Sequence, residues 1–469
     1  MEQLELSDIQ GFLVKEYKEM GCSTYFLLQV TNAANAKQFI ASVAGNITNV
    51  DSRVNDTALN IGFTSKGLKA LGYKENNLQS FTREFREGMV TPHRQRLLGD
   101  YDSSAPENWN WGGPANQDIH IVVMAFGKDE ATNNRYCNEL QAIFSASGLK
   151  EVLQLPGTSL PQDKEHFGFK DGISQPAIIG SGVTGVRNDN IKPGEFVMGY
   201  KNEYNVYPDA PLIQEQQGTM ELLPDDPAGS GFKNIGTNGT YFVLRQLKED
   251  VDGFWNFLND KTRNEDGSNN PDESTKLAAK MMGRWPSGAP LVKSPDTDPG
   301  GSSDDNDFNY IDTDKHGLKC PFGAHVRRTN PRDQFEVTGA AESLKLTRRH
   351  RIMRRVRSYG EQFTGSATNH TPNAEVGLLF GCFNADISRQ FEFIQYTWAN
   401  YPKFKQLYAD PDPFIGVREN PGPGVEQNFT IPQVTANKCI TGLKSFVTVK
   451  GGAYFFFPSI TAVKYLATI

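Results

Sequence analysis

The sequence predicts an α+β fold made of two similar halves, each with an antiparallel sheet that helices cover on one face. Runs rich in β-branched and aromatic residues alternate with helical patterns along the 469 residues, and a similar strand–helix order occurs in both halves. The connections between the strands are long and irregularly spaced. This spacing argues against a doubly wound parallel sheet, in which strands and helices alternate in short, regular units.

The first half contains three predicted strands, each dense in residues that favour an extended backbone. A helical pattern follows each strand, and the short middle helix begins at Ser65, a residue type that acts as an N-cap. In chain order, these strands and helices are predicted at Thr24–Val30, Ala34–Val43, Ala58–Phe63, Ser65–Leu71, Asp118–Phe126 and Glu130–Ser147.

A loose stretch, Gly180–Asn238, is rich in Gly, Pro and Asn and is the expected connection between the halves. The expected domains are therefore residues 1–200 and residues 201–469. In the second domain the strand–helix pattern starts again. Its elements are predicted at Thr240–Leu247, Val251–Leu258, Glu273–Met282, Glu375–Phe383, Ile387–Ala399 and Ala453–Phe457, of which the first, fourth and last are strands.

Composition excludes several classes of protein. The chain has 48 Lys and Arg against 55 Asp and Glu, a net charge of −7, which argues against sequence-independent nucleic-acid binding. No apolar run approaches the roughly 18 residues that a membrane helix needs. The segment Met1–Gly11 is acidic and lacks the basic start of a secretory signal. The five cysteines are scattered, with no Cys-x-x-Cys pair, as is usual in a reducing compartment. We therefore expect a cytoplasmic protein.

One histidine stands in a context that suits metal binding. The seven histidines form no HExxH or HxH pair, so a zinc hydrolase site is not predicted. In Cys320–Arg328 (CPFGAHVRR), however, His325 lies in a small-residue turn directly before two arginines. Haem suits this combination, because its iron takes an imidazole while its propionates attract guanidinium groups such as that of Arg328. A surface histidine in a basic loop is the alternative.

Two further segments carry charged residues in distinctive settings. Gly168–Pro176 (GFKDGISQP) places Asp171 between glycines, which allow a backbone to approach a flat cofactor closely. The same pattern also suits a simple turn. Arg348–Arg357 contains six arginines and His350, and on its own it suits an anion-binding face or a solvated strand.

Together these segments resemble the dye-decolourising (DyP-type) haem peroxidases. The resemblance runs nearly from end to end, and its long loops are similar to those of the larger members of the family. The matching segments, in order, are Asp8–Gly11, Gly168–Pro176, Lys192–Phe196, Thr240–Leu247, Leu277–Pro290, Cys320–Arg332, Arg354–Gly360 and Gly377–Phe383.

The resemblance implies two ferredoxin-like α+β halves, with haem b (iron protoporphyrin IX) held mainly by the C-terminal half. It makes His325 the proximal iron ligand, Asp171 the distal acid–base group and Arg354 the distal arginine. The distal segment, RRVRSYG, departs from the family's RRGxPYG form. The missing Gly and Pro leave the position of the arginine open, with Arg355 as the second candidate.

The resemblance also assigns the groups around the haem. Leu378 and Phe380 are expected as apolar walls on the distal side. A carboxylate should accept the Nδ1 proton of His325 and strengthen the imidazole as a donor. Asp412 best matches that acid, and Asp386 is the second candidate.

The implied activity is reduction of hydrogen peroxide coupled to oxidation of phenols or dyes, including bulky anthraquinones. Asp171 would move a proton and Arg354 would stabilise negative charge. In a closed apolar pocket, desolvation is expected to raise the pKa of Asp171, with Arg354 offsetting part of the rise. A porphyrin- or iron-handling protein and a nucleic-acid binder are the alternatives, and the oligomeric state is undecided.

Bulky dyes would need an oxidisable aromatic residue near the surface. Tyr396, Trp398 and Tyr401 cluster in sequence, and helical spacing would put Trp398 and Tyr401 on one face. The alternative is that these residues simply pack their helix against the sheet. Tyr359 is the next candidate.

Overall fold

Eight long strands form one closed antiparallel barrel in the computed structural model, which describes residues 3–186, 189–335, 339–361, 375–417 and 427–469. Around the barrel the strand order is β1-β3-β2-β14-β9-β11-β10-β4. The strands are β1 (Cys22–Val30), β2 (Thr57–Phe63), β3 (Ile121–Gly127), β4 (Leu149–Thr158), β9 (Thr240–Glu249), β10 (Met353–Tyr359), β11 (Gly377–Asn384) and β14 (Val447–Phe457).

The barrel consists of two four-stranded units with the same topology. In each unit the strands, counted along the chain, lie in the order fourth, first, third, second, which is the order of a ferredoxin-like sheet. The predicted duplication is therefore confirmed. The two sheets are also joined at both edges, each through a single residue pair, Phe456 with Phe63 and Ser358 with Thr158. Closure leaves the barrel without free edge strands.

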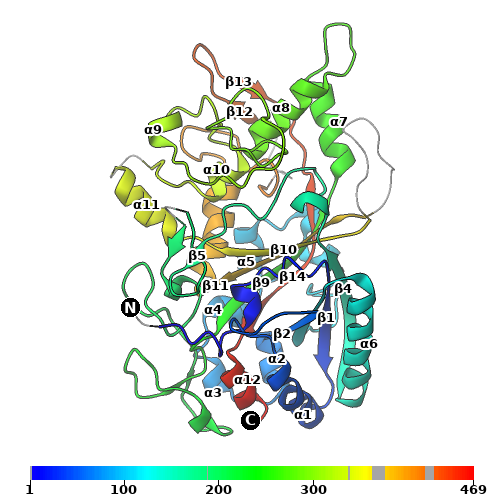
Figure 1. The fold of residues 1–469 in the computed structure, drawn as a ribbon, viewed down its shortest axis with the longest axis vertical. Helices are drawn as coiled ribbons and strands as arrows, with labels where there is room; N and C mark the ends of the chain where they lie inside the picture. The colour runs from blue at the N-terminus through cyan, green and yellow to red at the C-terminus, as the bar shows by residue number, and fades with distance from the viewer. Residues whose placement is uncertain (1–2, 187–188, 336–338, 362–374, 418–426) are drawn as a thin grey trace.

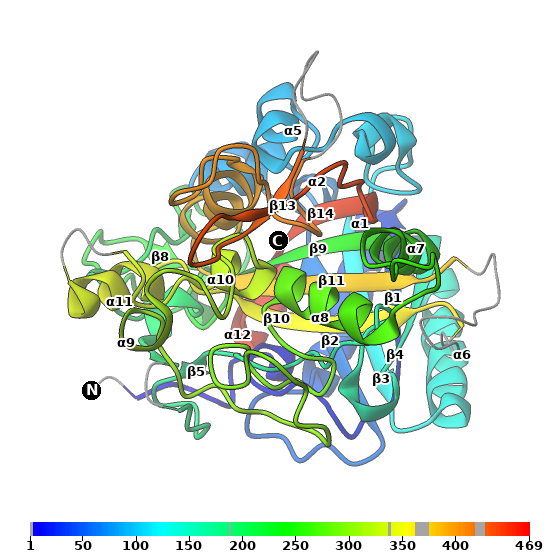
Figure 2. The ribbon, with the colours of Figure 1, turned by 90° about the horizontal axis from the view of Figure 1, so that it is seen from above.

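Helices cover the outside of this barrel (Figure 1), with α1, α2 and α12 below the strands and α7, α8 and α10 above them. Figure 2 shows α7, α8 and α10 lying over the strands of the C-terminal unit. The α-helices are α1 (Ala33–Val43), α2 (Ser65–Ala70), α3 (Glu75–Leu78), α4 (Arg83–Glu87), α5 (Pro92–Leu98), α6 (Glu130–Ala146), α7 (Val251–Lys261), α8 (Pro271–Met282), α9 (Ile311–Asp314), α10 (His325–Thr329), α11 (Ala340–Arg348) and α12 (Ile460–Leu466). Within the described ranges, none of them has the length and apolar character needed to cross a bilayer.

Side chains that accept a backbone N–H fix the starts of several helices. Asn32 caps α1, Asp129 caps α6 and Asp250 caps α7. The cap of α2 is Thr64, whose hydroxyl accepts the N–H of Gly67, so the predicted Ser65 cap was one residue late.

Several strands and connections match their prediction closely, and others do not. The runs predicted as strands correspond to β1, β2, β3, β9, β11 and β14. Two strands, β4 and β10, were missed because charged and polar residues interrupt their strand patterns, including Lys150, Glu151 and Gln154 in β4 and three arginines in β10. In the described part of the predicted connection Gly180–Asn238, the strands are the two-residue β6 (Asn190–Ile191), β7 (Leu212–Ile213) and β8 (Lys233–Asn234), and the equally short β5 (Ala177–Ile178) lies just before it. Near the C-terminus, β12 (Phe429–Ile431) and β13 (Lys438–Ile440) form a separate small hairpin.

The helix predicted at residues 387–399 is wound as π-helix. It consists of η9 (Ser388–Glu392) and η10 (Ile394–Asn400). A π-helix has i→i+5 hydrogen bonds and more residues per turn than an α-helix, so residues three apart do not share a face.

Alternation along the C-terminal strands separates two environments. One set of side chains fills the barrel together with residues of the N-terminal unit such as Tyr25 and Phe126. From β9, β11 and β14 this set includes Phe242, Leu244, Leu379, Phe383, Phe455 and Phe457. The alternate residues face outward, toward the loops and helices that lie over the C-terminal unit. The division of the chain at residue 200 remains a prediction.

Candidate active site

A cavity of about 280 Å³ lies against the outward face of the C-terminal strands. Its walls combine alternate strand residues with α10, the loop 165–174, η9, η10 and the loop 414–417. The strand residues are Arg245, Leu247, Glu249, Arg354, Val356, Leu378, Phe380, Val447 and Val449. The predicted wall residues Leu378 and Phe380 thus do line the cavity, because both occupy outward positions of β11.

His325 is the first residue of α10 and lines this cavity. Its Nδ1 lies 3.1 and 3.0 Å from the two carboxylate oxygens of Asp412. The predicted contact with Asp412 is therefore present. The second candidate, Asp386, instead accepts hydrogen bonds from the backbone and guanidinium of Arg389. Because Nδ1 is held by Asp412, Nε2 is the ring nitrogen left for a metal.

The carboxylate of Asp412 is buried but well stabilised. Burial acts to raise its pKa, and His325, Arg328 and the N–H of Ile415 together outweigh burial and hold the pKa below its usual value. The Oδ1 atom accepts the N–H groups of Phe414 at 2.9 Å and Ile415 at 3.1 Å. An ionised partner on Nδ1 makes the imidazole a stronger donor at Nε2.

Asp171 and Arg354 form an ion pair beside the same cavity. Nη1 of Arg354 donates to Oδ1 of Asp171 at 2.9 Å, and Nη2 donates to the carbonyl of Ile173 at 2.9 Å. Each of the two charged side chains is 28% exposed. The backbone N–H of Asp171 donates to the carbonyl of Asp163 at 2.8 Å, which fixes the loop.

The expected rise in the pKa of Asp171 is wrong in sign. Burial does act to raise it, but Arg354, the N–H of Gly172 and the more distant His325 outweigh burial and lower the pKa below its usual value. Asp171 is therefore ionised even in mildly acidic solution. The sequence could not show that the arginine contacts the carboxylate directly.

Strand alternation decides between the two candidate arginines. Arg354 points outward into the cavity, whereas Arg355 points the other way and is buried. The guanidinium of Arg355 donates to the carbonyls of Phe12, Leu13 and Val14 at 2.8–2.9 Å, tying β10 to the N-terminal segment. Regular pairing of β10 with β11 holds this register despite the missing Gly and Pro.

Comparison with known proteins agrees with this geometry. The family described as the DyP dimeric alpha+beta barrel domain matches residues 10–161. A dye-decolorizing peroxidase of Exidia glandulosa is 29% identical over 99% of this chain and 87% of its own length. The crystal structure of a DyP-type peroxidase from Auricularia auricula-judae has a TM-score of 0.79 at 26% identity, covering both chains fully. A dye-decolorizing peroxidase in complex with 2,6-dimethoxyphenol has a TM-score of 0.79 at 25% identity, over 99% of this chain and 100% of that one.

Over nearly its whole length, this chain is similar to dye-decolourising peroxidases.

In this relative of the dye-decolourising peroxidases, Arg328 is placed differently from our expectation. It is buried and does not line the cavity. Its Nε donates to the carbonyl of Trp398 at 2.7 Å, and its two terminal nitrogens donate to the carbonyls of Asp410 and Tyr401. Since every guanidinium nitrogen is used by the backbone, direct contact of Arg328 with a cofactor carboxylate is not supported. Arg328 instead holds the segment that carries Asp412.

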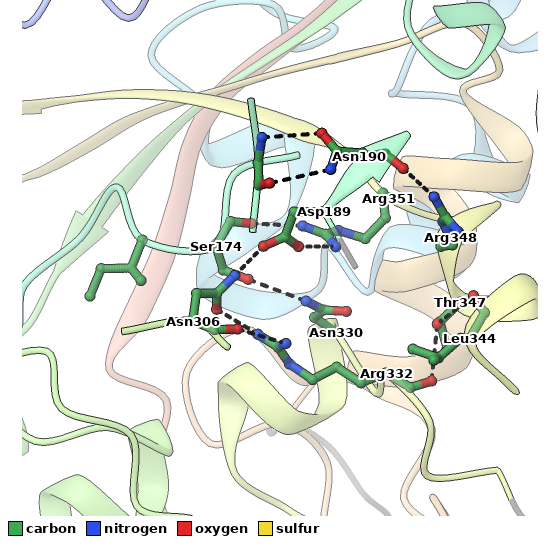
Figure 3. A network of polar contacts seen from close by, with 12 residues as sticks. Ser174, Asp189, Asn190, Asn306, Asn330, Arg332, Leu344, Thr347, Arg348 and Arg351 are labelled. Atoms are coloured by element: carbon green, nitrogen blue, oxygen red, sulfur yellow. Dashed lines mark hydrogen bonds and ion pairs between the residues drawn. The ribbon is translucent and has the colours of Figure 1, made fainter. Parts of the chain in front are cut away.

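A second group of arginines does line the cavity, and sequence reasoning missed it. Arg351 pairs with the buried Asp189 at 2.7 Å and donates to the carbonyl of Ser174 (Figure 3). Arg332 donates to the carbonyl of Phe308 at 2.8 Å and to the side chain of Asn306. Asn306 in turn donates to Asp189.

Part of this network could have been found from the sequence. Asn330 and Arg332 follow His325 closely in the chain, and Asn330 donates to the hydroxyl of Ser174 at 3.2 Å. Asp189 gave no such signal, because it comes from the loose connection far away in sequence. Ser174, Asn330, Arg332 and Arg351 are thus the polar cavity residues suited to the carboxylates of a cofactor.

Among the histidines in the described ranges, His325 alone lines the cavity. His166 hydrogen-bonds through Nε2 to the carbonyl of Tyr359 at 3.0 Å, and His316 is exposed. His350 stacks on Phe393. His370 lies outside the described residues.

The aromatic cluster does not have the predicted geometry. Trp398 is buried among Phe322, Ile394 and Phe404, whereas Tyr401 is 51% exposed. The two do not share a helical face, because η10 is π-helical and ends at Asn400, before Tyr401. Tyr396 is also exposed, and Tyr359 is buried.

Proposed function

We propose that this protein is a haem peroxidase that reduces hydrogen peroxide while it oxidises phenolic or dye-type substrates. One observation carries the proposal: His325, backed by Asp412, lines the same cavity as the ion pair of Asp171 and Arg354. The family relationship and the phenol complex of a related peroxidase support the substrate class.

The residues present fit a haem. His325 offers Nε2 to iron, because its other ring nitrogen is engaged by Asp412. The cavity walls are largely apolar, and Arg332, Arg351 and Asn330 would hold propionates. The sequence has no Cys-x-x-Cys pair for covalent attachment, so we propose haem b. The five free cysteines also support the expected cytoplasmic location.

When bound, the haem supplies the redox-active iron at which peroxide is reduced. Asp171, ionised because Arg354 lowers its pKa, takes a proton from one peroxide oxygen and returns it to the departing oxygen. Arg354 stays protonated and stabilises the negative charge that develops as the O–O bond breaks. Leu378 and Phe380 keep bulk water away from the reacting atoms.

A spectrum and an assay test the proposal directly. The purified protein should show the Soret absorbance of histidine-ligated haem and should oxidise 2,6-dimethoxyphenol and an anthraquinone dye only when peroxide is present. Bound haem without turnover would favour a porphyrin- or iron-handling protein. Absence of haem together with salt-sensitive RNA binding would favour a nucleic-acid binder. Either outcome would contradict the proposed peroxidase.

A further inference from the structure

Two carboxyl groups, one of them buried, line the cavity and have no part in the mechanism above. Glu165 lies in the loop before Asp171, and Glu249 is the last residue of β9. Both line the cavity that contains Asp171 and Arg354. Glu249 points into the cavity because it lies on the same face of the strand as Arg245 and Leu247, four and two residues earlier.

The two carboxyl groups differ in their hydrogen bonds. Glu165 accepts the backbone N–H groups of Phe167 at 2.7 Å and Phe169 at 2.8 Å, which favour its ionised form. Glu249 is 6% exposed, and its Oε2 is buried without a hydrogen-bond partner in the part of the chain that the structure describes. A negative charge on this buried oxygen would have no donor from the described chain to stabilise it, which favours the neutral acid form of Glu249.

The surrounding charges also favour the protonated form of Glu249. Burial raises the pKa of Glu249, and Glu165 and Asp171 raise it further. Burial also raises the pKa of Glu165, although its two backbone N–H donors and Lys164 oppose the rise. Tyr359 of β10 has a buried hydroxyl whose pKa is raised by burial and, to a smaller extent, by Glu375 and Glu249. The acids of this cluster therefore retain a proton, which Glu249 holds in preference to Glu165.

The proposed reaction needs protons at this place. Reduction of peroxide follows H₂O₂ + 2 e⁻ + 2 H⁺ → 2 H₂O, so protons must enter with the electrons. Asp171 only returns the proton that it has removed. A bulky dye oxidised at the protein surface delivers electrons through the protein and leaves its protons outside. Protons must therefore reach the cavity by a separate route.

Such a route begins in a second cavity, of about 100 Å³, that shares Glu165, Asp171 and Arg354 with the first. Its other walls carry charged residues, including Glu16, Lys18, Asp163, Lys164 and Arg357. Lys18 is exposed and Lys164 is partly exposed, so this polar cavity is the expected side of solvent entry.

We propose that Glu249 and Glu165 form a proton store that supplies Asp171 during turnover and refills through the second cavity. This inference rests on the proposed peroxidase function and concerns proton supply at the same site. Glu249 gives its proton by way of Glu165 to Asp171, which passes it to the oxygen atom being reduced. A proton from solvent then restores Glu249, because two adjacent carboxylates in a buried site repel each other. Glu249 acts on the reacting oxygen only through Asp171, so it is a positioning residue and not a catalytic residue.

Infrared spectroscopy detects the store without any turnover. A buried protonated carboxyl has a C=O band that is distinct from carboxylate bands and shifts in D₂O. At neutral pH the wild-type protein should show this band, and Glu249→Gln should lose the part of its intensity that Glu249 contributes. Glu249→Gln keeps the size of the side chain. The variant Glu249→Asp can still hold a proton, so it should keep the part of the band that Glu249→Gln loses. This comparison separates loss of the carboxyl group from an effect of repacking.

Steady-state kinetics test whether Glu249 supplies protons to Asp171 during turnover. Glu249→Gln in the haem-loaded protein should slow anthraquinone dye turnover by roughly 10–100-fold, near the lower end of losses for removed proton transfer. The loss should grow as pH rises, because solvent protons become scarcer, and Glu249→Asp should restore part of the rate. Glu392→Gln is the matched control, since burial raises the pKa of Glu392 to about 7 but its side chain does not line the cavity. It should leave the pH profile of turnover unchanged.

The outcomes are distinguishable. A carboxyl band of unchanged intensity in Glu249→Gln, or dye turnover that keeps its rate and pH profile in that variant, would overturn the proton store while the peroxidase assignment stands. A wild-type protein without haem or peroxide-dependent turnover would overturn the proposed function, and the delivery step with it.

Discussion

Arg354 and Asp171, 183 positions apart in the sequence, are joined by a 2.9 Å hydrogen bond between β10 and the loop that follows β4. These elements belong to different halves of the barrel, and they meet where β10 and β4 close it. The proposed proton-transfer group and its charge-stabilising partner therefore depend on barrel closure.

Replacing Arg354 should change the titration of Asp171. In Arg354→Leu the carboxylate loses the largest of the interactions that hold its pKa down, while burial still raises it. The acidic limb of the pH–rate profile should then move to higher pH by about 1–3 units. Lost charge stabilisation should also lower the rate by about 10²–10³-fold. The rate of peroxide-dependent dye oxidation from pH 2 to pH 7 measures both effects.

Arg355→Leu is the matched comparison, because Arg355 is the neighbouring residue and points away from the cavity. It should destabilise the fold by roughly 3 kcal/mol or more, since three backbone carbonyls lose charged donors. Arg354→Leu should unfold at nearly the wild-type urea concentration. Equal stability losses in the two variants would contradict the assigned register.

Removing the imidazole should remove the iron ligand. His325→Ala is expected to lose haem during gel filtration, because the chain then offers no other histidine at the described cavity. Haem content per protein, from the Soret absorbance, measures the loss. His316→Ala is the control, since His316 is exposed and outside the cavity, and it should bind haem as the wild type does. Full haem content in His325→Ala would refute the ligand assignment.

Asp412 should strengthen His325 as an iron ligand without binding the iron itself. Asp412→Asn removes the negative charge beside Nδ1 of His325 and should weaken haem retention by about 10–100-fold, as loss of such a partner usually does. Competition with apomyoglobin for the haem would measure this change. Asp386→Asn, the rejected alternative, should have no effect on haem affinity, because Asp386 contacts Arg389 and not His325. The reverse order of effects would restore Asp386 as the partner.

The buried His350 should make the folding stability of the protein depend on pH. Burial lowers its pKa to about 4, although its hydrogen bond to the carbonyl of Arg389 opposes the change. In the unfolded chain a histidine has a pKa near 6.5. Between about pH 4 and pH 6.5, His350 therefore binds more protons in the unfolded chain than in the folded protein. Folding stability should therefore fall as pH drops from about 6.5 to 4, by up to about 3 kcal/mol from this residue.

Urea unfolding of wild type and His350→Gln across that pH range measures the contribution. The variant should lose part of the acid destabilisation, whereas His93→Gln, at an exposed site, should keep it all. Parallel curves for wild type and His350→Gln would show that His350 does not carry the effect.

Oxidation of large dyes should depend on an exposed tyrosine. Tyr396 and Tyr401 are about half exposed, and the carbonyl of Tyr401 contacts Arg328 behind Asp412. Double replacement of Tyr396 and Tyr401 by Phe should lower anthraquinone turnover severalfold and leave haem content and peroxide consumption with small phenols unchanged. Tyr408→Phe, at a more exposed position, is the control. Unchanged dye kinetics in the double variant would redirect the search to other surface aromatics.

The sequence by itself determined the duplicated α+β pattern and most of the strands, and its resemblance to the DyP-type peroxidases assigned His325, Asp171 and Leu378 to the haem cavity. The strand and turn predictions depend on local information, namely β-rich runs and turn residues in a few neighbouring positions. The same local character explains why β4 and β10 were missed, because charged and polar residues interrupt their strand patterns.

Only the tertiary structure decided which charged groups meet. Barrel closure places Arg354 on Asp171 and so reverses the expected pKa shift. Strand register turns Arg355 toward backbone carbonyls, and the position of Arg328 on α10 does the same for its guanidinium. Glu249 became visible as a neutral acid only when its burial and missing partner were known. Electrostatic energies depend on distances and desolvation between residues far apart in the chain, and these quantities exist only in the folded molecule.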